Sequence, residues 1–210
     1  MDDLRLLCFG DSFTAGVGDA EGRGWVGRVA AASFAAGRPL TAYALGVRRE
    51  TSVEVAVRWR FEAQARLAAG ADCRVAFAVG ANDTTVEDGA RRVEPERSCM
   101  ALAAMLDQAA RMRLAAAVVG PPPVGDAAQR ERAVALCGRF AAVCAERRVP
   151  YVPLAAALAA SPTWIEEQAA GDGAHPGARG YDLLARLLLD GGLLDWLHAP
   201  ADAAAVIPGG

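Results

Sequence analysis

The chain has 210 residues, a mass of 21.8 kDa and a net charge of −3, which suits a single compact domain. It contains no lysine, so chemistry that depends on a phosphate-binding or Schiff-base lysine is excluded. No basic stripe indicates nucleic-acid binding, and no run reaches the roughly 18 apolar residues that a membrane helix requires. The five cysteines form no C-x-x-C pair, which favours a reduced, cytoplasmic location.

Five short apolar runs, each closed by glycine or proline, predict strands that are buried on both faces of a sheet. The runs cover residues 4–9, 40–45, 74–79, 114–119 and 149–152. Longer segments between them are rich in alanine, arginine and glutamate and predict helices over 25–36, 95–112 and 127–147. This alternation predicts an α/β fold in which helices cover both faces of a parallel sheet. We expect one domain over 1–200 and a C-terminal tail over 201–210.

The segment after the second predicted strand fits two structures. Its apolar residues alternate with polar or small ones up to Phe61, which is typical of a strand. Val53, Val57 and Phe61 are also four positions apart, as on one side of a helix. Thr51 and Glu54 have the spacing of a capping box. Because helix-forming residues continue to position 69, we predict a helix that begins near residue 52.

Ser12 follows the first predicted strand within the segment Gly-Asp-Ser-Phe-Thr-Ala-Gly at 10–16. Ligands of parallel α/β sheets bind at the carboxyl ends of the strands, so Ser12 is a candidate to face a substrate. An ordinary serine at a helix N-terminus is the structural alternative. The glycines at 16, 18 and 22 have the wrong spacing for a dinucleotide-binding loop and lie too far from the strand.

Asp172 and His175 are three residues apart, so both side chains can project from one turn. A carboxylate at that distance can orient an imidazole, which then takes a proton from a hydroxyl group. A polar turn explains the same residues without any catalytic role. We expect no metal site, because His198 is remote in the sequence and no cysteine lies nearby.

Two further residues follow predicted strands. Asn82, the only asparagine, comes after the third strand, where its amide could donate to a developing oxyanion. Gly46 comes after the second strand and could present its backbone N–H to the same point. The alternatives are a left-handed turn at Asn82 and an unremarkable glycine at the end of a strand.

In combination, these loops resemble the four sequence blocks of the SGNH hydrolases, the GDSL-type esterases and lipases, over residues 4 to about 190. The matching blocks are Gly10-Asp11-Ser12, Gly46, Gly80-x-Asn82-Asp83 and Asp172-x-x-His175. The resemblance implies a flavodoxin-like, three-layer α/β/α sandwich with five parallel strands in the order 2-1-3-4-5. Two residues depart from the family pattern: Phe13 replaces a leucine, and Arg49 stands where many members have a second glycine.

The resemblance also implies roles for individual residues. Ser12 would be the nucleophile, His175 the general base and then acid, and Asp172 the carboxylate that orients it. The oxyanion hole would combine the backbone N–H groups of Ser12 and Gly46 with the side chain of Asn82. No cofactor or metal is implied.

We therefore expect a serine esterase that cleaves short-acyl or aryl carboxylic esters, or thioesters, through an acyl-enzyme on Ser12. Its partner would be a small-molecule ester, with no nucleic acid and no membrane span. Three alternatives stay open. They are a carbohydrate-ester deacetylase of the same family, a non-catalytic ligand-binding domain, and a flavodoxin-like nucleotide or flavin binder, which offers no use for Asp172 and His175.

Overall fold

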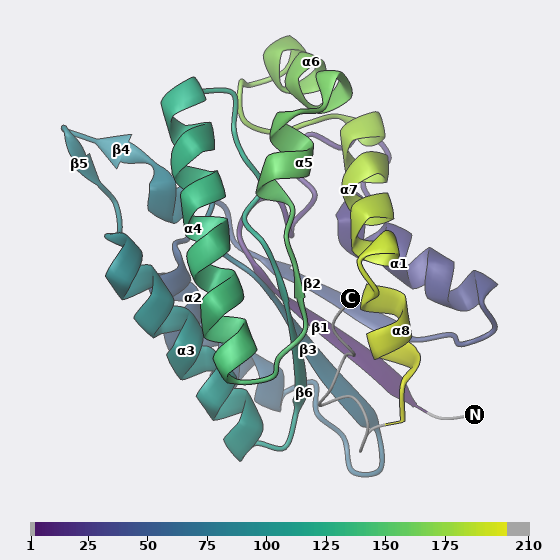
Figure 1. Ribbon diagram of the computed structural model, residues 1–210. Helices are drawn as coiled ribbons and strands as arrows, with labels where there is room; N and C mark the ends of the chain where they lie inside the picture. The colour runs from purple at the N-terminus through teal and green to yellow at the C-terminus, as the bar shows by residue number, and fades with distance from the viewer. Residues whose placement is uncertain (1–2, 201–210) are drawn as a thin grey trace.

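The computed structural model describes residues 3–200, and the tail predicted over 201–210 lies outside them (Figure 1). A five-stranded parallel sheet is covered by helices on both faces, as in a three-layer α/β/α sandwich. The sheet consists of β1 (Leu4–Gly10), β2 (Thr41–Gly46), β3 (Asp72–Ala78), β6 (Ala115–Val119) and β7 (Tyr151–Val152). Each strand overlaps one of the five apolar runs, so the predicted fold class is confirmed.

The strand order is β2-β1-β3-β6-β7. Counted along the chain within this sheet, that order is 2-1-3-4-5. The labels run higher because β4 (Val86–Glu87) and β5 (Ala90–Arg91) form a separate antiparallel hairpin. This hairpin was not predicted. Asp88 and Gly89 both have positive φ angles, of 52° and 80°, which is the two-residue turn that an Asp-Gly pair favours.

Strand β1 is buried on both faces, as its continuous apolar sequence predicts. Successive side chains of a strand point to opposite faces, so Leu6 and Cys8 join one core cluster while Leu7 and Phe9 join the other. The first cluster includes side chains of α1 (Gly24–Ala35), α5 (Ala155–Ala159), α6 (Pro162–Ala170), α7 (Ala178–Asp190) and α8 (Leu193–His198). The second includes side chains of α2 (Ser52–Gln64), α3 (Pro95–Arg111) and α4 (Ala127–Glu146).

The ambiguous segment is the helix α2, which ends at Gln64 rather than near residue 69. Thr51 and Glu54 form both halves of a capping box, so local hydrogen bonding favours the helix over a strand. Its buried side contains Val55 and Trp59, whereas Phe61 is 64% exposed. The row of residues four positions apart that ends at Phe61 therefore lies on the outer side of the helix.

The register of the central strands brings their carboxyl ends to one edge. Gly10, the last residue of β1, is paired with Gly46 on one side and with Ala78 on the other. The loops that follow β1, β2 and β3 therefore start side by side. None of the helices within residues 3–200 combines the length and the hydropathy needed to cross a bilayer.

Candidate active site

The structure brings together Ser12, His175 and Asp172. The Nε2 atom of His175 lies 2.7 Å from Ser12 Oγ, and its Nδ1 atom lies 2.7 Å from Asp172 Oδ2. The imidazole thus connects the hydroxyl group to the carboxylate through hydrogen bonds at both ring nitrogens. The ring belongs to the loop between α6 and α7, whereas Ser12 lies in the loop after β1.

The loop after β1 holds Ser12 by local hydrogen bonds. Asp11 Oδ1 accepts from the backbone N–H of Phe13 at 3.0 Å, and the Ser12 carbonyl accepts from Val17 N–H at 3.0 Å. Gly10 is required at the end of the strand, because a Cβ there would overlap the side chain of Thr14. These contacts fix the backbone on both sides of the hydroxyl group.

The side chain of Phe13 is buried next to the imidazole of His175. It is 4% exposed and stacks on Trp164, with ring centroids 6.0 Å apart. Its ring centroid lies 5.0 Å from that of His175. The phenylalanine that departs from the family motif is therefore buried against the ring whose position it supports.

Asp172 is held as a carboxylate by the turn that it begins. Its Oδ1 accepts from the backbone N–H groups of Ala174 at 3.0 Å and His175 at 2.8 Å. Partial burial opposes ionisation of Asp172, but hydrogen bonds from the His175 backbone, the His175 ring and the Ala174 backbone lower its pKa to about 2. The negative charge that would stabilise an imidazolium is therefore present throughout the neutral pH range.

Gln168, which the sequence did not single out, holds the loop that carries His175 through hydrogen bonds to backbone carbonyls. This buried side chain donates from Nε2 to the carbonyls of Ala174 at 2.6 Å and Pro123 at 2.8 Å. Its own backbone carbonyl accepts from Gly173 N–H at 2.9 Å. A lone glutamine in a helix carries no pattern that would reveal such a role before the fold is known.

Asn82 begins the short 3₁₀ helix η1 (Asn82–Thr84) directly after β3. Its Nδ2 donates to Asp11 Oδ2 at 3.1 Å and to the Glu50 carbonyl at 3.0 Å. The carboxamide therefore connects the loop of Ser12 to the loop that follows β2.

Asp11 is a buried acid behind Ser12. Desolvation, together with the charge of nearby Asp83, raises its pKa to about 7 against the hydrogen bond from Phe13 N–H. Asp83 itself accepts from the backbone N–H of Ser52 at 2.8 Å and from its hydroxyl group. The two carboxyl groups tie the loops after β1 and β3 to the start of α2.

Gly46 lies at the edge of the sheet, close to the loop of Ser12. A Cβ at this position would overlap the Asp11 carbonyl and Ala15 N–H, so close packing accounts for the glycine. Val47 N–H donates to the Gly10 carbonyl at 3.1 Å. Because N–H groups alternate in direction along a strand and β2 is an edge strand, the N–H of Gly46 points away from β1. This direction does not favour the donor role expected for Gly46, which stays a prediction.

The turn from Val47 to Glu50 follows Gly46 and is closed by Glu50 N–H donating to the Val47 carbonyl at 3.3 Å. Arg49, its third residue, has a φ of +66°. Turns of this kind usually have glycine or asparagine there, and a left-handed residue with a side chain costs about 1–2 kcal/mol. Arg49 thus adopts a left-handed conformation that a glycine would adopt without this cost.

A family model, the GDSL-like Lipase/Acylhydrolase family, matches residues 8–183. The chain belongs to this family. It is therefore a hydrolase of the esterase and lipase type. No curated protein matches the sequence.

Solved structures with this fold include other GDSL-like hydrolases. The lipase/acylhydrolase from Enterococcus faecalis has a TM-score of 0.74 at 24% identity, and the alignment covers 91% of this chain and 95% of that one. The esterase EstA from Pseudoalteromonas sp., inhibited by monoethylphosphonate, has a TM-score of 0.70 at 18% identity over 94% and 100% of the two chains. Axe2, an acetylxylan esterase from Geobacillus stearothermophilus, has a TM-score of 0.71 at 16% identity over 100% and 99%. These likenesses show that the GDSL-like hydrolase fold extends over nearly the whole chain.

The second histidine of this GDSL-like hydrolase lies outside the candidate site. His198 ends α8, and its Nε2 is 2.8 Å from the hydroxyl group of Ser33, which itself donates to the Arg38 carbonyl. Arg38 in turn donates to the His198 carbonyl. This cluster fixes the end of α8 against the loop after α1.

Proposed function

We propose that this protein is a serine esterase that cleaves short-acyl or aryl carboxylic esters, or thioesters, through an acyl-enzyme on Ser12. The observation that carries the proposal is the unbroken hydrogen-bonded path from Ser12 Oγ through the His175 ring to Asp172. A polar turn alone would not aim the second ring nitrogen at a serine from another loop. We therefore assign Ser12, His175 and Asp172 as a catalytic triad.

In the proposed reaction, Ser12 Oγ attacks the ester carbonyl carbon while His175 Nε2 takes the hydroxyl proton. The tetrahedral intermediate collapses when the imidazolium returns that proton to the leaving alcohol or thiol, which leaves an acyl-enzyme. Water, deprotonated by His175, then attacks the acyl carbon, and the imidazolium returns the proton to Ser12 Oγ as the acid is released. Asp172 holds the ring in the tautomer with a proton on Nδ1 and stabilises its charged form.

The oxyanion would be stabilised by the backbone N–H of Ser12 and the carboxamide of Asn82. The family resemblance implies Gly46 as a third donor, but its N–H points away from β1, so the proposal does not depend on it. In the free protein, the Asn82 amide donates to Asp11 and to the Glu50 carbonyl. Stabilising an oxyanion therefore requires one of these bonds to be shared with the substrate oxygen. A preorganised donor of this kind typically contributes about 2.7–4 kcal/mol to the transition state.

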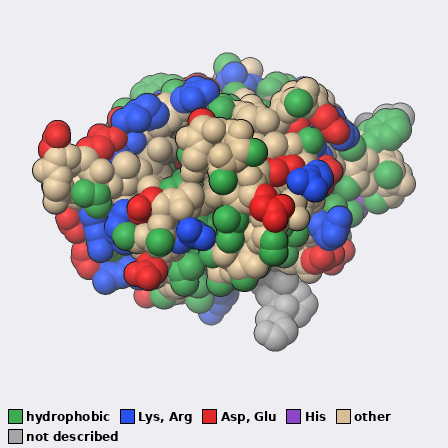
Figure 2. Space-filling model, turned by 90° about the horizontal axis from the view of Figure 1, so that it is seen from above, with side chains coloured by type: hydrophobic (Ala, Val, Ile, Leu, Met, Phe, Trp, Pro, Cys, Tyr) green, Lys and Arg blue, Asp and Glu red, His purple; other side chains and the backbone are tan. Residues whose placement is uncertain are grey.

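The proposed mechanism uses the protein's own side chains and backbone N–H groups together with water, and it requires no cofactor or metal. Figure 2 looks onto the end of the molecule that carries α6 and the β4–β5 hairpin, where charges of both signs are interspersed with apolar side chains. Such a surface favours a small ester over a polyanion as the ligand. We also propose that the protein acts in the cytoplasm and has no nucleic-acid partner.

A carbohydrate-ester deacetylase is the second candidate, favoured by the likeness to the acetylxylan esterase Axe2, which extends over the whole chain. The two candidates differ in the alcohol that they accept. Hydrolysis of p-nitrophenyl acetate, butyrate and octanoate, measured beside acetate release from acetylated xylo-oligosaccharides, distinguishes them. The esterase proposal predicts the highest kcat/KM on a short aryl ester, whereas a clear preference for the acetylated sugar would favour the deacetylase. Activity on neither, with a folded protein, would favour a non-catalytic domain.

A further inference from the structure

The Val47–Glu50 turn lies between the two halves of the candidate site. At its start, Val47 N–H donates to the carbonyl of Gly10, two residues before Ser12. At its end, the Glu50 carbonyl accepts from Asn82 Nδ2 at 3.0 Å. The orientation of the Asn82 carboxamide therefore depends on where this turn places the Glu50 carbonyl.

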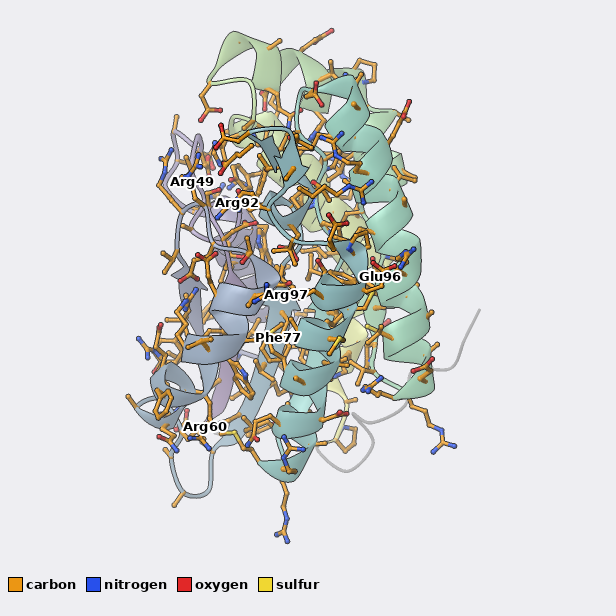
Figure 3. The ribbon with its side chains drawn as sticks, turned by 90° about the vertical axis from the view of Figure 1, so that its left-hand side faces the viewer. Arg49, Arg60, Phe77, Arg92, Glu96 and Arg97 are labelled. Carbon is orange, nitrogen blue, oxygen red and sulfur yellow. The ribbon has the colours of Figure 1, made fainter. Side chains whose placement is uncertain are left out.

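The conformation of the turn is unfavourable on its own, because Arg49 occupies the left-handed position. Contacts from the β4–β5 hairpin hold it there. Arg92, immediately after β5, donates from Nη1 to the Arg49 carbonyl at 2.6 Å. The Arg49 side chain reaches back to the hairpin and pairs with Glu87 at 2.6 Å. Figure 3 shows Arg49 and Arg92 close together at this end of the molecule.

The Arg92 side chain is itself held in place. It is 17% exposed, its guanidinium lies 3.6 Å from Glu54 and 3.8 Å from Glu87, and its backbone N–H donates to the Thr85 carbonyl at 2.9 Å. Glu54 belongs to the capping box of α2, which begins directly after the turn. Arg92 thus connects the hairpin, the turn and the start of α2.

We propose that Arg92 is a positioning residue of the site: it holds the Arg49 carbonyl and thereby keeps the Glu50 carbonyl where it orients the carboxamide of Asn82. The inference rests on the proposed esterase function. It assigns a role to the β4–β5 hairpin, which contributes no residue to the catalytic triad that we propose. It also explains how the site accommodates an arginine in place of a glycine.

The first test replaces Arg92 and measures hydrolysis of p-nitrophenyl acetate. Because misplacing a catalytic group by 1 Å costs on the order of a hundredfold, we expect Arg92→Ala to lower kcat by about ten- to a hundredfold. KM should change by less than about threefold, since the interaction lost acts in the transition state. Arg91→Ala, on the same hairpin and with the same loss of charge, is the matched control and should keep the wild-type kcat. Arg92→Lys, which keeps the charge and a hydrogen-bond donor group but loses the planar guanidinium, should recover part of the loss.

The second test separates positioning from simple stabilisation. Arg49→Gly removes the cost of the left-handed conformation, so adding it to Arg92→Ala should restore most of the lost kcat. If Arg92 only stabilised the hairpin, the same substitution would lower the melting temperature further, because it removes the Arg49–Glu87 ion pair, and would leave kcat low. That result, or a wild-type kcat in Arg92→Ala, would overturn the proposal.

Hydrogen exchange provides a readout that does not depend on activity. The Glu50 amide closes the turn, so its exchange should be faster in Arg92→Ala than in wild type or Arg91→Ala. If the wild-type protein hydrolyses no ester, the proposed function fails, while faster exchange still shows that Arg92 holds the turn. Unchanged exchange at Glu50 would contradict the positioning role whatever the activity.

Discussion

His175 Nε2 lies 2.7 Å from Ser12 Oγ, although the two residues are 163 positions apart in the sequence. The contact depends on two independently fixed loops. The backbone around Ser12 is held by Asp11 and by the end of β1, and the loop of His175 is held by Asp172 and Gln168. The alignment of hydroxyl group and ring is therefore a property of the fold rather than of one local motif.

Asp172→Asn should reduce turnover without unfolding the protein. The amide would hold the ring in the wrong tautomer and could not stabilise an imidazolium, which lowers kcat by up to about 10⁴-fold in a serine triad. The Asp172 side chain is 50% exposed, so water can replace part of the interaction and the loss should stay below that limit. Steady-state kinetics on p-nitrophenyl acetate, with circular dichroism as the control for folding, measures it. Wild-type kcat in Asp172→Asn would remove Asp172 from the mechanism.

Asn82→Ala should lower kcat by about 10²–10³-fold, which is the effect of removing one oxyanion donor. The same substitution deletes the hydrogen bonds to Asp11 and Glu50, so a lower melting temperature is also expected. Ser12 should still react with a fluorophosphonate probe, though more slowly, because the nucleophile and base are unchanged. Full turnover in a folded Asn82→Ala would mean that the carboxamide serves structure alone.

Asp19→Asn should lower the free energy of unfolding more at neutral pH than in acid. Asp19 is buried and accepts from Arg28 and from Gly24 N–H at 2.8 Å, and these bonds outweigh desolvation and lower its pKa to about 2. A carboxylate with a depressed folded-state pKa stabilises the protein above its unfolded value of 3.8, and this contribution is lost as the pH falls through about 2. Breaking a buried pair costs about 3–5 kcal/mol when the remaining charge has no partner. Arg28 keeps its ion pairs with Glu21 and Asp182, so the loss should stay below that range.

Urea unfolding of wild type and Asp19→Asn at pH values of about 7, 4 and 2 would measure this difference. These values run from well above the unfolded pKa of Asp19 down to about its folded pKa, the range over which linkage predicts the change. The gap between the two proteins should be largest at neutral pH and should shrink toward the acid end. A gap that stayed constant across this range would mean that Asp19 contributes packing rather than charge.

The five sheet strands could be predicted because strands buried on both faces are continuously apolar, and such runs stand out in an alanine-rich chain. The helices after β7 were not predicted. Ala155–Ala159 has no polar residue to set a period, whereas the 13 residues of Ala178–Asp190 alternate apolar and polar residues at helical spacing, a signal that could have revealed this helix. The hairpin had its Asp88-Gly89 signal, but strands of two residues carry no alternation.

The candidate site was predictable where chemistry requires an unusual residue, and not where it depends on backbone direction. Ser12, Asn82 and His175 are rare residue types in this chain, so their positions after strands or near the end carried information. The direction of the Gly46 N–H follows from strand register, which the sequence does not contain. Gln168 and Arg92 act through carbonyl groups of distant loops, and no spacing along the chain encodes such contacts.

Covalent labelling tests the central claim most directly. Wild-type protein and Ser12→Ala are treated with a fluorophosphonate probe, and the modified peptide is identified by mass spectrometry, with p-nitrophenyl acetate hydrolysis measured on the same samples. The account predicts a single phosphonyl adduct on Ser12 that abolishes hydrolysis, and neither adduct nor turnover in Ser12→Ala. An adduct on another residue, or undiminished hydrolysis by Ser12→Ala, would contradict it.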